Sequence, residues 1–274
     1  MCYAGAVSSK TFQAHKLTEN RPHPVSDALA VEAVLHVKVN GEPYTTTVRT
    51  PGADEALARG LLYTEGVLVD PSIAPDYHHV PEPDSGFTGC LEITVPDAAL
   101  AKDIRGRRSS MTNASCGLCG LREAEELLPP DCTSLPVPRK RLSRRAIPGL
   151  LEALASRQPL FQETGGAHGA LAFTAAGAIL TAHEDIGRHN AVDKVIGDLL
   201  ATGRLDQPCG LVVSGRLSYE IVFKAYRARL PYLLAVSAPS SMAVEMAELF
   251  GMCVIAFCRE DRATVYSRPA LLAD

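Results

Sequence analysis

Short apolar runs alternate with amphipathic segments through the second half of the chain. Residues 169–174 and 178–185 predict two strands joined by a tight turn, and paired apolar positions in 191–203 have the spacing of a helix. The pattern continues with expected strands at 210–215, 232–238 and 253–258 and expected helices at 218–230 and 240–251. Strands this apolar imply a largely parallel sheet with helices on both faces. We therefore expect a three-layer α/β/α sandwich.

The first half of the chain has a different pattern, typical of β-structure. Residues 28–50 alternate apolar and polar positions around Asn40-Gly41, which predicts a β-hairpin. Asp54 is expected to cap a helix that ends at Gly66. Another short strand is expected at 90–96.

A change of composition divides the two halves. Between Leu127 and Pro148 the sequence becomes rich in proline, serine and arginine, as linkers often are. We therefore predict an N-terminal β-rich domain over residues 1–138, which ends in a cysteine-bearing loop and helix. A C-terminal α/β domain is predicted over 139–274, which makes the chain α/β, or α+β overall.

Composition narrows the class of protein. The chain has 274 residues, of which 46% are hydrophobic, enough for a real core. No signal peptide opens it and no apolar run reaches the length of a membrane helix, so we expect a cytoplasmic protein without a membrane partner. Its eight cysteines are spread thinly, which suits free thiols. A net charge of −4 argues against a nucleic-acid partner, and the basic runs 105–108 and 139–145 are interpreted first as solvated faces.

Polar loops follow the predicted strands of the second half. Ligands of open α/β sheets bind at the carboxyl ends of the strands, so loops 184–190, 214–218, 237–241 and 257–261 should meet at one edge. Hairpin geometry brings residues 163–168 to the same edge. We call these five loops the rim.

The residue types of the rim suit an anionic, nucleotide-like ligand. Glycines permit close backbone approach, serines can cap helices whose N-termini attract phosphate, and arginines supply charge. The histidines could be ligands or ordinary hydrogen-bonded side chains. The candidates are Gly165, Gly166, Gly187, Gly215, Ser214, Ser218, Ser240, Ser241, Arg188, Arg216, Arg259, Arg262, His168, His183 and His189.

Cys116 and Cys119 form the one CxxC motif of the chain. A structural zinc site normally needs four ligands, and apart from Cys132 no further ligand pattern accompanies the pair. A thioredoxin-like pair should follow a strand, which the residues before Cys116 do not resemble. The HxE and PCxxC signatures of zinc deaminases are missing. Metal binding, redox chemistry and a purely structural turn stay open as alternatives.

Nucleophilic sulfur is the alternative that the surroundings of the pair favour. Arginines at 105, 107 and 108 and the start of a predicted helix would both lower the pKa of a nearby thiol. Cys116 is the better nucleophile candidate: it could accept a persulfide sulfur, and Cys119 could relay that sulfur or close a disulfide to expel it.

The motifs together resemble a known family, the formate dehydrogenase accessory sulfurtransferases or FdhD family. The similar segments are SCGLCG, TGGAHGA, EDIGRHNAVDKVIG, SGRLSYEIVFKA, SAPSSMAVEMAELFG and RTPGADEALARGLLYTEG. The similarity runs from about residue 25 to the end of the chain.

This resemblance implies a function. A cysteine desulfurase would pass sulfur to the protein, with Cys116 as the persulfide residue and Cys119 as its partner. The protein would carry the sulfur to the molybdenum or tungsten bis(molybdopterin guanine dinucleotide) cofactor before that cofactor enters formate dehydrogenase. GDP would serve as a partial mimic of the cofactor. The resemblance also implies a homodimer, no structural metal, and a C-terminal domain like the cytidine deaminase fold. The alternative function is a chaperone that binds the cofactor without chemistry.

The family's cofactor-binding segment falls on the end of the rim. It comprises Phe257, Cys258, Arg259, Glu260, Asp261 and Arg262. Family members often carry a neutral residue or glycine in the middle, where this chain has Glu260-Asp261, whose charges would oppose a phosphate. Arg259 and Arg262 could offset them.

Overall fold

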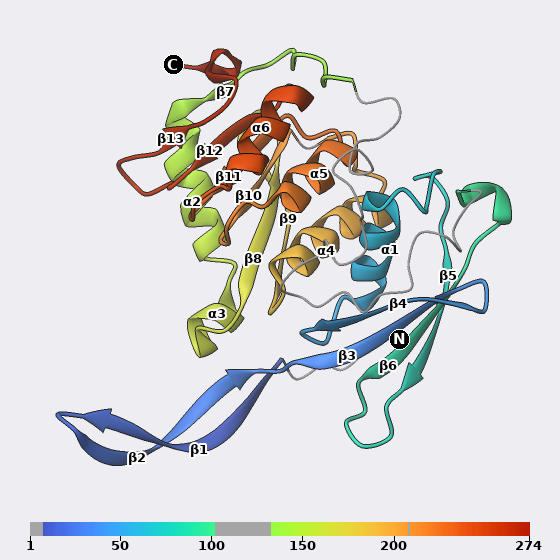
Figure 1. The fold of residues 1–274 in the computed structure, drawn as a ribbon, viewed down its shortest axis with the longest axis vertical. Coiled ribbons are helices and arrows are strands. Elements are labelled where there is room, and N and C mark those ends of the chain that lie inside the picture. Colours follow the sequence, from blue (N-terminus) through green and yellow to red (C-terminus); the bar gives the residue numbers. More distant parts are fainter. Residues whose placement is uncertain (1–7, 102–132, 208) are drawn as a thin grey trace.

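The computed structural model describes residues 8–101, 133–207 and 209–274 (Figure 1). The predicted sulfur site, Cys116 and Cys119, and the third cysteine Cys132 lie outside the described residues. The domain boundary predicted at 138 stays a prediction.

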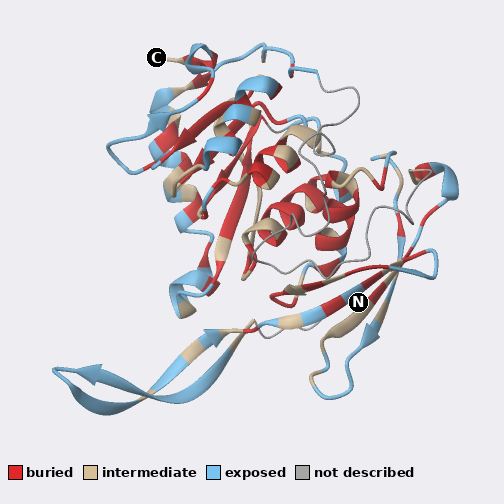
Figure 2. Ribbon diagram, viewed as in Figure 1, coloured by how far each residue is buried: buried red, intermediate tan, exposed pale blue. Residues whose placement is uncertain are grey.

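A long hairpin precedes the body of the protein. Strands β1 (Ser9–Thr18) and β2 (Arg21–Ala30) pair with each other in an antiparallel ribbon. The ribbon projects from the body and is almost wholly exposed (Figures 1 and 2). Left-handed Glu19 and Asn20 form its turn, with φ of 51° and 60°. Sequence analysis missed this hairpin because neither of its faces is buried, so no apolar alternation marks it.

The predicted hairpin around Asn40-Gly41 is confirmed as part of a four-stranded sheet in the order β4-β3-β6-β5. Its strands are β3 (Ala33–Val39), β4 (Glu42–Arg49), β5 (Asp76–Pro81) and β6 (Thr88–Thr94), the last of which is the strand expected at 90–96. Both turn residues have positive φ, 48° and 82°, as a two-residue hairpin turn requires. A short 3₁₀ helix, Asp97–Ala99, follows β6.

Helix α1 (Asp54–Thr64) covers one face of this sheet. Leucines at 57, 61 and 62 pack against Leu35 and Leu91 of the strands. The prediction that Asp54 caps the helix is wrong: Ala53 is the cap residue, in a left-handed conformation, and no side chain caps α1. The Asp54 carboxylate instead accepts two hydrogen bonds, of 2.8 and 2.9 Å, from the buried guanidinium of Arg49. A buried arginine needs a paired carboxylate more than a helix end needs a cap.

A six-stranded sheet in the order β13-β12-β11-β10-β8-β9 forms the second half. Its strands are β8 (His168–Phe173), β9 (Ile179–Asp185), β10 (Gly210–Val213), β11 (Tyr232–Ala235), β12 (Cys253–Ala256) and β13 (Thr264–Val265). Strands β10, β11 and β12 are parallel, but β8 runs antiparallel to both its neighbours and β13 antiparallel to β12. The sheet is therefore mixed and not largely parallel, because the β8–β9 hairpin and the short return strand β13 need no helical crossover.

Both faces of this sheet are covered, as predicted. Helices α4 (Arg188–Ala201), α5 (Tyr219–Arg227) and α6 (Ser241–Phe250) bury one face. Helix α2 (Ile147–Ala155) and the end of the chain cover the other. The remaining elements are α3 (Pro159–Thr164), the strands β7 (Leu142–Ser143) and β14 (Leu272–Ala273), which pair with each other, and 3₁₀ helices at Arg144–Ala146 and Pro269–Leu271.

The two sheets are joined through the contact of α1 with α4. At the crossing the backbones touch: a Cβ on Gly60 would lie 1.9 Å from the carbonyl oxygen of Asp193, and one on Gly197 would lie 1.8 Å from that of Ala56. Beside it, the Lys224 ammonium lies 2.7 Å from the Asp193 carboxylate in a buried ion pair. In the part of the chain that the structure describes, no helix is long and apolar enough to cross a membrane.

Candidate functional site: the rim of the six-stranded sheet

The carboxyl ends of β9, β10, β11 and β12 lie at one edge of the sheet, as the sequence predicts. Hydrogen bonds link the loops in series. The loop after β10 pairs with the loop after β11 through Leu217 and Pro239, and the N–H of Phe257, after β12, donates to Ser237. On the other side, Ser214 accepts from the N–H of Gly169 at 2.9 Å.

The fifth loop, 163–168, joins the same edge because β8 is antiparallel. His168 begins β8 and stands opposite Asp185, which ends β9. Gly165 has a φ of 67° and closes α3, and both Gly165 and Gly166 are exposed. The structure therefore brings all five predicted loops together.

His189 contacts two polar side chains of the rim. Its Nε2 lies 2.8 Å from the Glu220 carboxylate and 3.2 Å from the Ser218 hydroxyl. Burial raises the pKa of Glu220, but the hydrogen bond and charge of His189, with Lys224 and Arg188, outweigh it, so the net pKa is lowered. Ser218, expected to cap α5, stands at the cap position but bonds His189 instead.

Of the other three serines predicted as helix caps, only Ser240 caps a helix. Ser240 caps α6 by accepting from the N–H of Ala243 at 3.2 Å. Ser214 accepts from a strand N–H and is no cap. Ser241 is the first residue of α6. Helices α4 and α5 therefore begin at the rim without a side-chain cap. The first turn of α5 already holds the Glu220 carboxylate, so only the N-terminal end of α4 is suited to an anion.

A buried polar network holds the start of α4 in place. The Asp185 carboxylate is fully buried, lies 2.7 Å from the Lys194 ammonium, and accepts from the N–H of Gly187 and the amide of Asn190. It also accepts from the N–H of Thr50, so the segment before α1 is tied to the rim. The network fixes the direction in which α4 presents its first residues.

The terminal loop is exposed, apart from one residue. Phe257 is 43% exposed with a φ of 51°, and Glu260, Asp261 and Arg262 are exposed as well. Cys258 is buried, and burial raises the pKa of its thiol. Only backbone atoms of Cys258 could therefore reach a ligand.

Arg259 is held against the neighbouring loop. Its guanidinium donates to the carbonyls of Val236 and Cys258 at 2.6 and 2.7 Å. Arg216, from the loop after β10, is exposed.

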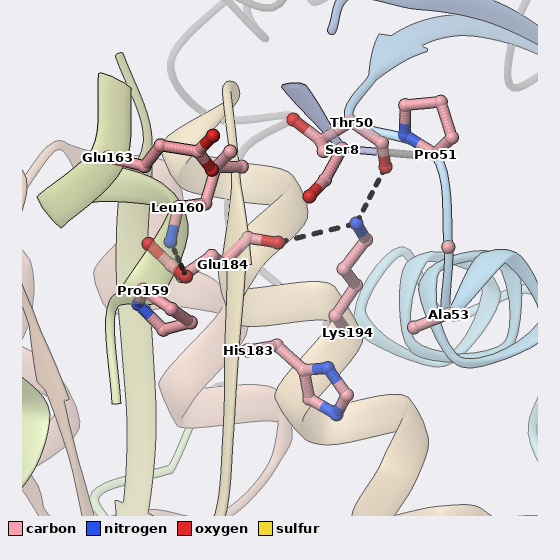
Figure 3. Close-up of a pocket in the computed structure, with 11 residues that line it drawn as sticks. Ser8, Thr50, Pro51, Ala53, Pro159, Leu160, Glu163, His183, Glu184 and Lys194 are labelled. Carbon is pink, nitrogen blue, oxygen red and sulfur yellow. Dashed lines mark hydrogen bonds between the residues drawn. The ribbon is translucent and has the colours of Figure 1, made fainter. Parts of the chain in front are cut away.

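A cavity of about 240 Å³ lies at one end of the rim, where Glu163 and Glu184 of two rim loops contribute to its lining (Figure 3). It is lined by Ser8, residues 50–53, α3, and His183, Glu184 and Lys194. Lys194 turns toward it, but its ammonium already donates to the carbonyls of Thr50 and Glu184 and pairs with Asp185. We assign no ligand to this cavity.

The flanks of the cysteine-bearing segment lie away from the rim. The N–H of Ala101 donates a hydrogen bond to the carbonyl of Val67, just past the C-terminal end of α1. The backbone of Thr133 forms hydrogen bonds with the hydroxyl of Tyr226, near the C-terminal end of α5. The rim is at the N-terminal ends of α4, α5 and α6. Among the described residues, no group of three or more histidine, cysteine or acidic side chains is arranged to hold a metal ion.

Sequence reasoning missed several residues that build the rim. Glu220, the partner of His189, was not predicted as a site residue, and the network of Asp185, Lys194 and Thr50 was not predicted either. The available signal was Lys194 itself, which lies in α4 between the apolar pairs 191/192 and 195/196, since a buried charge requires a partner.

Comparison with known proteins places the chain among sulfur carriers. A family model, the FdhD/NarQ family, matches residues 30–273. A sulfur carrier protein FdhD from Anaeromyxobacter dehalogenans is 38% identical over 279 residues, which cover 96% of this chain and 93% of that protein. Those of Mycolicibacterium paratuberculosis and Mycobacterium tuberculosis are 36% and 39% identical, and cover 96% and 88% of this chain and 97% and 90% of their own lengths.

One solved structure shares the fold over nearly the whole chain. It is the crystal structure of a candidate formate dehydrogenase accessory protein from Desulfotalea psychrophila, with a TM-score of 0.76 and 21% identity. The match covers 97% of this chain and all of that one.

Proposed function

The chain belongs to the FdhD/NarQ family, and from this premise we propose that it is a sulfur carrier for formate dehydrogenase that works through a persulfide on Cys116. The observation that carries the proposal is the match over nearly the full length of proteins named as sulfur carriers, in a chain with a single CxxC motif. The proposed donor is a cysteine desulfurase. We also propose that the protein acts in the cytoplasm and as a homodimer.

Sulfur would be loaded by thiol–persulfide exchange. The thiolate of Cys116 attacks the terminal sulfur of the desulfurase persulfide, a new S–S bond forms on Cys116, and the desulfurase cysteine leaves as a thiolate. No net oxidation occurs. The attacking form is the thiolate, so the arginines before Cys116 favour the step by lowering its pKa.

Discharge would use the second cysteine. The Cys119 thiolate attacks the inner sulfur of the Cys116 persulfide, which closes a Cys116–Cys119 disulfide and releases hydrosulfide to the cofactor. A cellular dithiol then supplies two electrons to reopen the disulfide.

The proposed acceptor is a bis(molybdopterin guanine dinucleotide) cofactor, bound as substrate at the rim. The N-terminus of α4, which has no side-chain cap, supports an anionic ligand together with Arg188 and Arg216. The exposed arginines of the terminal loop add positive charge, and the exposed carboxylates of Glu260 and Asp261 extend into solvent-accessible surface, where repulsion of a phosphate is screened.

Sulfur loading is tested by intact mass. After incubation with a cysteine desulfurase and cysteine, we expect an adduct of ~32 Da on the wild type and on Cys90→Ala, and none on Cys116→Ala. Cys90 is the matched control because it is a partly exposed thiol whose pKa is raised, chiefly by burial. An adduct that persists in Cys116→Ala would refute the carrier role of that residue.

Ligand binding is tested by calorimetry with GDP. Loss of a charged hydrogen bond costs about 1.5–3 kcal/mol, so Arg188→Ala and Arg262→Ala should each weaken binding by roughly 10-fold to 150-fold. Unchanged affinity in both variants would move the site elsewhere. If formate dehydrogenase is activated equally by wild type and Cys116→Ala, the protein is instead a chaperone that binds the cofactor without chemistry.

A further inference from the structure

The ribbon of β1 and β2, which we call the arm, extends from the body without a core of its own (Figure 2). Its exposed side chains include Phe12, Leu17 and Leu29, which are 50%, 73% and 45% exposed. The base of the arm contacts α3, where the Ser9 hydroxyl donates to the Glu163 carboxylate. A two-stranded ribbon is at best marginally stable alone in water, so a ribbon of this length is expected to have a partner.

The edge of β1 is open. In the part of the chain that the structure describes, β1 pairs with β2 alone. The N–H of Val31 donates to the carbonyl of Ser8 at 2.8 Å, which fixes the alternation of the antiparallel ladder. Even-numbered residues of β1 therefore bond to β2, whereas the odd-numbered residues of 11–17 direct their N–H and C=O groups outward. This edge is a row of backbone donors and acceptors that a further strand can use.

Proline closes the other edge of the arm. Pro22 and Pro24 stand opposite Leu17 and His15, so both occupy outward-facing positions of β2. Neither has an N–H to offer a further strand. Proline on an outer edge is a common protection against strand addition, and β1 contains no proline. The sequence therefore blocks one edge and leaves the other free.

The open edge is complementary to a second copy of itself. Residues directly opposite each other in a sheet share a face, so a two-fold axis that relates two β1 strands must pass through a residue position. The greatest overlap of the two strands places that axis at residue 13 or 14. An axis at Gln13 would oppose Lys10 to Lys16, which are like charges. An axis at Ala14 instead opposes each Lys16 to a Phe12 ring, and no like charges then stand opposite each other.

We propose that the edge of β1 is the interface of a homodimer, in which two arms join antiparallel about Ala14 into one four-stranded sheet. This inference rests on the proposed homodimer and names its interface. The outward backbone groups of 11–17 bond to those of the second copy, and the prolines at both outer edges stop the sheet from growing beyond two copies. The match to the family model begins at residue 30, so it does not account for the arm.

The first test places a proline on one edge at a time. Gln13 and Ser26 stand opposite each other, Gln13 on the open edge and Ser26 on the edge that carries the prolines. Both Gln13→Pro and Ser26→Pro lose the exposed 3.4 Å contact between these side chains, but only Gln13→Pro removes a donor from the proposed interface. Sedimentation equilibrium should give wild type and Ser26→Pro a mass of twice the 29.2 kDa of one chain. The dissociation constant of Gln13→Pro should be at least about tenfold higher, since the dimer loses two hydrogen bonds.

A cysteine pair checks the register without any proline. At the axis, the two copies of Ala14 form a non-hydrogen-bonded pair with Cα atoms about 4.5 Å apart, which a disulfide can bridge. Oxidation of Ala14→Cys by glutathione disulfide should therefore give a 14–14 linked peptide, identified by mass spectrometry after proteolysis. Thr18→Cys is the control, because in the same pairing the two copies of position 18 lie about 27 Å apart.

The outcomes separate the interface from the homodimer. An equal dissociation constant for wild type and Gln13→Pro, or the lack of a 14–14 link in Ala14→Cys, would overturn the arm interface while leaving the homodimer in place. A wild type that is monomeric at micromolar concentration would refute both, and the open edge would then suit an extended segment of another protein. None of these results bears on the persulfide on Cys116, which the mass measurement decides separately.

Discussion

Two glycine-to-alanine substitutions in helices should change stability in opposite directions. Gly197→Ala places a methyl group in the crossing of α4 with α1, where its Cβ would lie 1.8 Å from the backbone oxygen of Ala56. An ordinary contact needs 3.4 Å or more, so the two helices would have to move apart. Gly149 lies exposed in α2, and a Cβ there meets nothing within 4 Å.

The magnitudes follow from packing and helix propensity. Overpacking costs typically about 1–3 kcal/mol, with more where neither neighbour can rotate away, as here with backbone against backbone. Alanine recovers about 1 kcal/mol of helix propensity relative to glycine. We therefore expect Gly197→Ala to lower the free energy of unfolding by about 2 kcal/mol, and Gly149→Ala to raise it by about 0.5–1 kcal/mol.

Urea unfolding followed by circular dichroism measures both. The free energy of unfolding should fall for Gly197→Ala at an unchanged m-value, because the surface exposed on unfolding is nearly the same. A Gly197→Ala protein as stable as Gly149→Ala would show that α1 and α4 do not touch at this point, and the described joint between the two sheets would be wrong.

Three further predictions address buried charge and thiols. Lys224→Met should lower the free energy of unfolding by about 3–5 kcal/mol in urea titrations, because it leaves the buried Asp193 carboxylate unpaired; a loss near zero would contradict the pairing. Despite burial, the hydrogen bond to His189 lowers the pKa of Glu220 in the folded protein. The ionised Glu220 therefore stabilises the fold above its unfolded pKa of about 4.3, and this stabilisation is lost as pH falls through the lower folded pKa. The melting temperature should accordingly fall less steeply between about pH 5 and 3 in Glu220→Gln than in wild type. Burial raises the pKa of Cys209 to about 12, so mass spectrometry after brief alkylation of native protein should find it unmodified, and rapid modification would contradict its burial.

The joint at Gly197 also bears on the rim. Helix α4 begins with Arg188 and His189 at the rim and crosses α1 further along. The ties of Asp185 to Thr50 and of Lys224 to Asp193 fix the same helix from both sides. The N-terminal half therefore contributes to the site by holding α4, although none of the rim loops belongs to it.

The spacing of apolar positions along the sequence was enough to predict the main strands and helices of the second half. Strands such as β10 and β11 are apolar at every position because both faces of the sheet are covered, and the helices between them show one apolar stripe each. The position of the rim followed as well, since strand ends and loop polarity are local properties of the sequence. The CxxC motif and the family resemblance gave the proposed chemistry without any coordinates.

Only the tertiary structure decided how charges and close contacts are distributed. Asp54 looks like a helix cap in sequence, but its carboxylate is taken by Arg49, five residues earlier on the chain and buried beside it. Ser218 likewise stands at the cap position of α5, but its hydroxyl forms a hydrogen bond with His189 and does not cap the helix. The exposed β1–β2 hairpin left no apolar pattern because it buries no face. Hydrophobic burial acts on every residue of an element and so leaves a periodic signal, whereas a single ion pair or hydrogen bond joins residues whose separation along the chain is set by the fold.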